Sequence, residues 1–155
     1  ALVDLDRYFY PLDTIREWNR IYGRGGFAQH QCVLPLHNAR AGLGEILERV
    51  ARAGSGSFLA VLKRLGPGRS GLSFPMEGYT LALDFPVGRR NLALLDELDT
   101  VVAQCGGRIY LAKDARAQRP VIAAGYPDLA TFGERRAHGG EGPRLESLLS
   151  RRLGL

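Results

Sequence analysis

The order of strand-type and helix-type hydrophobic patterns is the feature of this sequence that most constrains its fold. Residues 27–35, 57–65, 79–85 and 108–112 are short runs rich in strand-forming residues, several of them alternating apolar and polar side chains. Amphipathic helix patterns, with apolar residues at helical spacing, separate the first run from the second and the third from the fourth. The helical stripes consist of Leu43, Ile46, Leu47 and Val50, and of Leu95, Leu98, Val102 and Cys105.

The order strand, helix, strand, strand, helix, strand is typical of the ferredoxin-like α+β fold. It predicts a four-stranded antiparallel sheet whose two helices cover one face. The opposite face is then free for a ligand or a partner domain.

The last part of the chain has a different character. It is rich in Arg, Gly and Pro, with short helical stretches near 117–125, 128–136 and 144–153. A flexible connector is expected at Gly139-Gly140-Glu141-Gly142-Pro143. Because this segment lacks the periodic apolar residues of a core, we expect it to dock on something else or to be poorly ordered.

Alternation along the strands separates a polar face of the predicted sheet from an apolar one. Gln29 and Gln31 lie two positions apart and therefore share a face. Buried amides need several hydrogen-bond partners, so this pair is unsuited to a core. Thr80, Ala82 and Asp84 also share a face, and Lys63 lies on the neighbouring strand. Such a surface is typical of a sheet that roofs a ligand pocket, and a plain solvated face is the alternative.

Lysine is rare in this sequence. Among 21 basic residues only Lys63 and Lys113 are lysines, and the rest are arginines. The planar guanidinium of arginine does not replace a compact ammonium, so these two positions are candidates for a specific role. Lys113 follows the fourth strand, where its charge can reach a cleft without being buried along its whole length.

Composition argues against several classes of function. The net charge of +5 is spread along the chain without interleaved aromatics, so nucleic-acid binding is not expected. No apolar run approaches the length of a transmembrane helix. Cys32 and Cys105 have no metal-ligand spacing, and we expect both to be reduced and unpaired. No metal site is expected. The protein is expected in the cytoplasm, either free or associated with a membrane.

Several short motifs occur in a distinctive order. They are Phe9-Tyr10-Pro11-Leu12-Asp13, Glu17-Trp18-Asn19, Gln29-x-Gln31, Leu72-Ser73-Phe74-Pro75, Asp84-Phe85-Pro86, Gly106-Gly107-Arg108-x-Tyr110 and Ala112-Lys113-Asp114. In this order and at these spacings they resemble the C-terminal half of FAD-linked oxidases of the vanillyl-alcohol oxidase superfamily. Within that superfamily the chain is similar to the decaprenylphosphoryl-ribose oxidase family of bacteria.

The resemblance implies a division of the chain. Members of the family are flavoproteins with an N-terminal FAD-binding domain and a substrate-binding (cap) domain. By this likeness residues 1–112 are the C-terminal part of the substrate-binding domain. Residues 113–155 would return to an FAD-binding domain that is absent from the chain, and would lack their docking partner here. The chain begins with Ala1, not Met, and we expect it to be cut from a longer protein.

The resemblance also implies roles for individual residues. The substrate pocket would be lined by Gln29, Gln31, Lys63, Thr80 and Ala82, with Tyr10 at its edge. Ala82 stands where the mycobacterial enzymes have a cysteine, and Leu65 where they have an aromatic residue, so the pocket wall differs. The resemblance places Tyr110 and Lys113 at the cofactor. Lys113 would be the catalytic residue, stabilising the developing alkoxide or the flavin edge.

The activity implied is the oxidation of a secondary alcohol of a sugar, or of a polyprenyl-phosphate-linked sugar in cell-wall biosynthesis, by hydride transfer to FAD. The FAD-binding domain would hold most of the cofactor, so the chain alone should be inactive, and a partner reductase is a further candidate. One alternative is an aldonolactone or alditol oxidase of the same superfamily. Another is a non-enzymatic ferredoxin-like module that binds a partner through its open sheet face.

Overall fold

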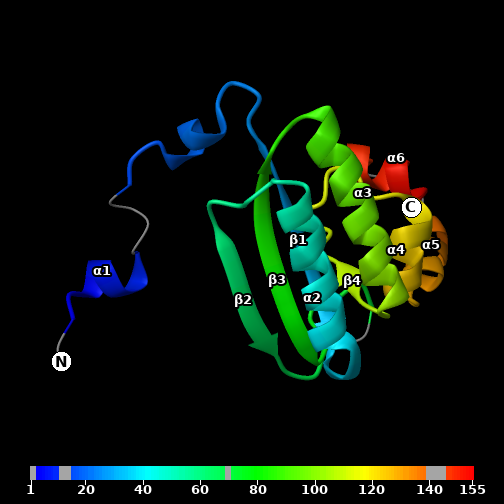
Figure 1. Cartoon of the computed structure of the whole chain (residues 1–155). Coiled ribbons are helices and arrows are strands. Elements are labelled where there is room, and N and C mark those ends of the chain that lie inside the picture. Colours follow the sequence, from blue (N-terminus) through cyan, green and yellow to red (C-terminus); the bar gives the residue numbers. More distant parts are fainter. Residues whose placement is uncertain (1–2, 11–14, 69–70, 139–145) are drawn as a thin grey trace.

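The computed structural model describes residues 3–10, 15–68, 71–138 and 146–155. A four-stranded sheet forms its centre, in the order β2 (Ala60–Leu65), β3 (Gly78–Pro86), β1 (Phe27–Pro35), β4 (Arg108–Ile109) (Figure 1). Every pair of neighbouring strands is antiparallel. This confirms the α+β prediction and the ferredoxin-like order of elements.

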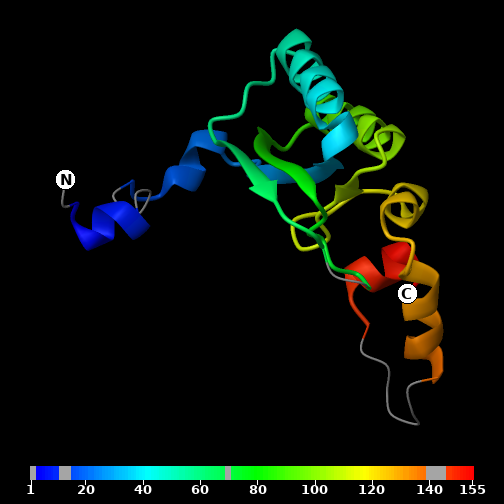
Figure 2. The same ribbon diagram turned by 90° about the horizontal axis from the view of Figure 1, so that it is seen from below.

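Two long helices, α2 (Leu36–Arg52) and α3 (Arg89–Gln104), cover one face of the sheet side by side (Figures 1 and 2). Their apolar stripes form the core with the inward-facing strand residues, since burying these side chains is the main stabilising contribution. The buried members on the strands are Cys32, Leu34, Leu81, Leu83, Phe85 and Ile109; those on α2 and α3 include Ile46, Val50, Leu94, Leu95, Leu98, Val101 and Val102.

The strands differ from the prediction at two ends. β2 begins at Ala60, not at residue 57, because the Ser57 hydroxyl accepts the backbone N–H of Asp84 in place of a strand partner. β4 ends at Ile109, not at residue 112. There the backbone N–H groups of Lys113 and Asp114 both donate to the Tyr110 carbonyl and form a turn.

The C-terminal segment packs on the sheet domain of this same chain, which corrects the expectation that it would lack a docking partner here. It contains α4 (Arg119–Gly125), α5 (Leu129–His138) and α6 (Leu148–Leu153). The buried Tyr126 donates its hydroxyl hydrogen to the Ile109 carbonyl over 2.7 Å. The segment's other core residues are Ala117, Ile122, Leu129 and Leu153. The predicted connector at 139–143 lies outside the described residues.

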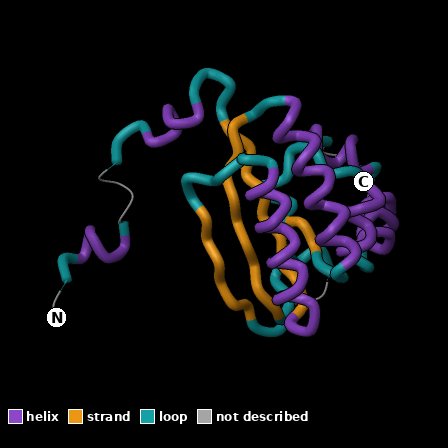
Figure 3. Tube along the Cα trace, viewed as in Figure 1, coloured by secondary structure: helices purple, strands orange, loops and turns teal. Residues whose placement is uncertain are grey.

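The N-terminal part runs away from the sheet (Figures 1 and 3). Helix α1 (Leu5–Phe9) has no buried residue and stands apart from the rest of the molecule. A short 3-10 helix, η1 (Trp18–Tyr22), leads into β1 and contributes the buried Tyr22. Of the described helices, none is both long enough and apolar enough to cross a membrane.

Candidate functional site

The sheet face opposite α2 and α3 carries the predicted polar residues. The strand register sets Gln29 opposite Asp84, and Gln31 opposite Ala82. On the other side of β3, Lys63 lies opposite Thr80. Directly opposed residues share a face of an antiparallel pair, so the five residues predicted from β1, β2 and β3 lie together.

Asp84 is the centre of the hydrogen bonds on this face, although the sequence did not mark it as a site residue. Its side chain is fully buried. One carboxylate oxygen, Oδ1, accepts from Gln29 Nε2 at 2.7 Å, and the other, Oδ2, accepts from the Tyr22 hydroxyl at 3.3 Å. The described residues contain no Lys, Arg or His paired with this carboxylate. The sequence feature that could have identified Asp84 is its alternation with Thr80 and Ala82, which puts it on the same face of the strand. Its hydrogen-bond partner Gln29 is known only once the register between β1 and β3 is known.

A second hydrogen bond joins neighbouring residues of the same face. Gln31 Nε2 donates to the Thr80 hydroxyl oxygen over 3.2 Å. Thr80 is 3% exposed, whereas Gln29 and Gln31 are half-buried. Each glutamine thus uses its amide nitrogen within the protein and keeps part of its side chain accessible from the open face.

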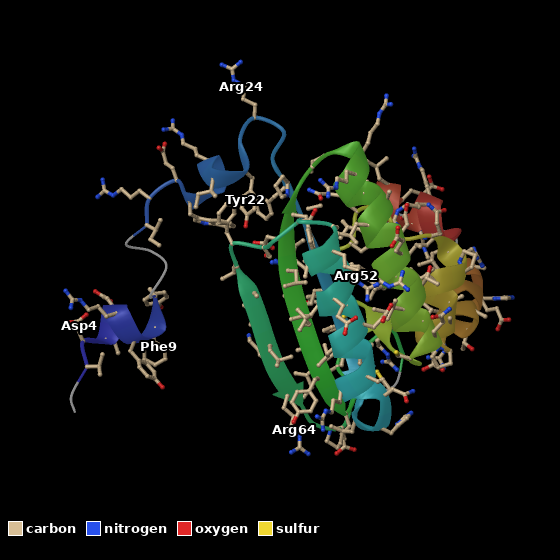
Figure 4. The ribbon with its side chains drawn as sticks, viewed as in Figure 1. Asp4, Phe9, Tyr22, Arg24, Arg52 and Arg64 are labelled. Atoms are coloured by element: carbon tan, nitrogen blue, oxygen red, sulfur yellow. The ribbon has the colours of Figure 1, made fainter. Side chains whose placement is uncertain are left out.

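Aromatic residues lie at one end of the polar face. Tyr22 stacks on Phe27 with ring centroids 4.7 Å apart, and Trp18 and Phe58 contact it edge-on. Burial raises the pKa of Tyr22, and the neighbouring Asp84 carboxylate raises it further. Figure 4 shows Tyr22 at the end of the sheet. An apolar hollow adjoins it, lined by Ile15, Trp18, Ile21, Tyr22, Phe58 and Leu59.

A loop of the chain covers the part of this face that lies towards β4. Phe74 stacks on Tyr110 with ring centroids 4.4 Å apart. Arg108 donates to the Ser73 carbonyl at 2.7 Å, and its guanidinium lies 5.2 Å from the centre of the Tyr126 ring. Tyr110, predicted to touch the cofactor, is therefore held beneath the motif Leu72-Ser73-Phe74-Pro75.

Lys113 lies in the turn after β4, with its side chain exposed. The turn flanks the edge of β1, where Gln29 and Lys113 line the same small cavity. Arg116, on the far side of the turn, pairs with the buried Asp99 at 2.9 Å, and Asp99 contacts His30 Nε2 at 3.0 Å. This chain of contacts through the core fixes the turn relative to β1.

Asp114 closes the Lys113 turn and joins it to α6. Its Oδ1 accepts the backbone N–H groups of Arg116 and Ala117 at 3.0 and 2.8 Å, and its Oδ2 accepts from Arg152 at 2.7 Å. Burial alone would raise the pKa of Asp114, but these hydrogen bonds and the Arg152 charge together hold it below its ordinary value. The ionised form is therefore the one that stabilises the fold.

Asp114→Asn is expected to destabilise the chain by about 2 kcal/mol at pH 7, the scale of losing hydrogen bonds to a charged group. A carboxyl group whose pKa is lowered by folding stabilises the folded state at pH values above its unfolded-state pKa. This stabilisation is lost as the pH falls through the folded-state pKa. The difference between wild type and Asp114→Asn should therefore shrink below about pH 4. Urea unfolding between pH 3 and pH 7 measures this difference, and a gap that stays constant over that range would contradict the assignment.

Some predicted residues are not brought to this face. Tyr10 is 56% exposed and follows α1, whose Phe9 points into solvent away from the sheet (Figure 4).

Cys32 and Cys105 are free thiols, and burial raises the pKa of Cys32 to about 12, so this thiol is unreactive at neutral pH. Within the described ranges, no three His, Cys, Asp or Glu side chains gather as metal ligands do.

The sequence of the chain is similar to those of two curated bacterial proteins. The chain is homologous to the C-terminal part of an FAD-linked oxidase. The relative that shows this is decaprenylphosphoryl-β-D-ribose oxidase of Mycolicibacterium smegmatis, 40% identical over 125 residues. That match covers 80% of the chain and 27% of the relative.

A second relative comes from Streptomyces coelicolor, where it is described by its position in the mprA 5′ region. It is 42% identical over 136 residues, which cover 86% of the chain and 37% of the relative. The chain thus spans well under half the length of each of these two relatives. No protein-family model matches the chain.

Proposed function

We propose that this chain forms the substrate-binding side of an FAD-dependent oxidoreductase that oxidises a secondary alcohol of a sugar, with a lipid-phosphate-linked sugar as the preferred substrate. The observation that carries the proposal is the 40% identity over most of the chain to decaprenylphosphoryl-β-D-ribose oxidase. In this proposal residues 1–112 belong to a substrate-binding domain, and residues 113–155 also contact an FAD-binding domain.

The residues present fit one side of a flavin and its substrate. The open face offers the half-buried amides of Gln29 and Gln31, and the small cavity at the edge of β1 is lined by both Gln29 and the exposed Lys113. The described residues contain no glycine-rich loop between a strand and a helix to cradle a pyrophosphate. The FAD phosphates are therefore assigned to another part of the enzyme, and this chain to the reacting side of the ring.

Bound FAD would accept the hydride from the alcohol carbon. Lys113 would place its ammonium beside the negative charge that develops as the hydroxyl proton leaves, and would lower the barrier electrostatically. Gln29, Gln31 and Thr80 would hold the sugar hydroxyl groups in place, and Lys63 and Ala82 would complete the pocket wall. Tyr110, fixed by Phe74, would contact the cofactor.

The test is anaerobic mixing of the full-length flavoprotein with a short-chain prenylphosphoryl-β-D-ribose, followed by flavin absorbance. Bleaching in one turnover, with weaker reaction for free alditols and aldonolactones, supports the proposal. Faster reaction with an alditol or aldonolactone assigns the enzyme to that other class. A full-length protein that binds no flavin would overturn the proposal and favour a binding module.

A further inference from the structure

The buried Asp84 carboxylate has an unusual set of partners. It is fully buried, yet its two oxygens accept from the neutral groups Gln29 Nε2 and Tyr22 OH. Both Asp84 oxygens act as acceptors in this geometry, whereas an amide and a phenol can each donate or accept. Asp84 therefore decides which way both neighbours present their polar atoms.

The consequence for Gln29 is a fixed amide orientation. Since Nε2 must face Asp84, the amide oxygen Oε1 points away from it, and the described residues give Oε1 no donor. Gln29 is half-buried on the open face, so part of this residue is accessible to a ligand there. The phenol oxygen of Tyr22 is constrained in the same way, because its hydrogen is directed at the carboxylate.

We infer that Asp84 is a specificity-determining positioning residue, which makes Gln29 present a hydrogen-bond acceptor to a ligand hydroxyl group. This inference rests on the proposed function for the identity of the ligand. A hydroxyl can donate to the fixed oxygen, whereas fluorine at the same position cannot donate and its lone pairs oppose it. The site should therefore distinguish a sugar hydroxyl from a fluorine of similar size.

Inhibition constants of the three monofluoro analogues of a short-chain prenylphosphoryl-β-D-ribose, measured on the full-length flavoprotein, test the inference. In the wild type, fluorine at one ring or exocyclic position should weaken binding about tenfold, the scale of one hydrogen bond. In Asp84→Asn that penalty should fall below about threefold, because asparagine offers either an oxygen or an N–H and no longer compels one orientation.

A double variant restores the arrangement. In Asp84→Asn with Gln29→Glu, the new amide can donate to the new carboxylate, whose second oxygen again faces the ligand as an acceptor. The fluorine penalty should return to about tenfold. The matched control is Glu45→Gln, a carboxylate on α2 that pairs with Arg49 on the helix-covered side of the sheet and should keep the wild-type penalty. Equal penalties in wild type and Asp84→Asn, or loss of the penalty in the control, would overturn the inference.

A separate readout does not depend on catalysis. Side-chain amide exchange, followed by NMR on the 155-residue chain, should show one Gln29 proton exchanging about tenfold more slowly than those of the exposed Gln104. Equal exchange at the two residues would show that Asp84 does not hold the amide. If this protection is present but the full-length protein oxidises no sugar, the proposed function fails while the positioning by Asp84 stands.

Discussion

Replacing Lys113 by methionine is expected to slow flavin reduction in the full-length enzyme by about 10²-fold or more, the usual scale for losing one electrostatic stabiliser of a transition state. Methionine is an unbranched side chain of similar length that removes the ammonium group and its charge. The backbone of the turn is held by Asp114, Arg116 and Arg152, so the fold should be unaffected. Stopped-flow absorbance under anaerobic conditions measures the rate.

Arg64→Met is the matched control for Lys113→Met. Arg64 is an exposed cation on β2 that faces away from the polar residues, opposite Tyr79. This variant should reduce flavin at the wild-type rate. A rate for Lys113→Met within about threefold of wild type would remove Lys113 from the mechanism.

Tyr126→Ala is expected to destabilise the chain by about 3–5 kcal/mol, the cost of truncating a fully buried aromatic side chain. Tyr126 is 1% exposed and belongs to the same core cluster as the residues of β1 and α3. The Arg108 guanidinium also lies over the Tyr126 ring, and the Tyr126 hydroxyl donates a hydrogen bond to the Ile109 carbonyl. Urea unfolding of the 155-residue chain, followed by circular dichroism, measures the loss.

Phe132→Ala serves as the comparison, because Phe132 lies on α5 in the same C-terminal segment but is 42% exposed. Its truncation should cost about 1 kcal/mol or less, as for residues outside a packed core. A near-neutral Tyr126→Ala would mean that the C-terminal segment is held by another domain and contributes little to this one.

Strand alternation predicted the polar face because a period of two needs no knowledge of pairing. Gln29 and Gln31 share a face whatever strand lies beside them. The hydrogen bond from Gln29 to Asp84 could not be predicted, since it depends on the register between β1 and β3.

The packing of the C-terminal segment on the sheet could not be predicted from the sequence, for a different reason. Ile122, Tyr126 and Leu153 lie on short helices or beside them, so no periodic stripe marks them as core residues. Their burial depends on contacts with residues far away in sequence, such as that of Tyr126 with Ile109. The end of β4 was missed because the backbone N–H groups of Lys113 and Asp114 form a turn on the Tyr110 carbonyl, which outweighs the strand propensity of residues 110–112.

Because β2 is an edge strand of the sheet, Lys63 has a second role there. One side of this strand has no partner strand in the described structure, and a free edge of this kind can pair with the edge of another molecule. Lys63 and Arg64 put two adjacent exposed charges at its centre, one on each face, and oppose such self-association. Removing the Lys63 charge to study substrate binding therefore also weakens the protection of the protein against aggregation.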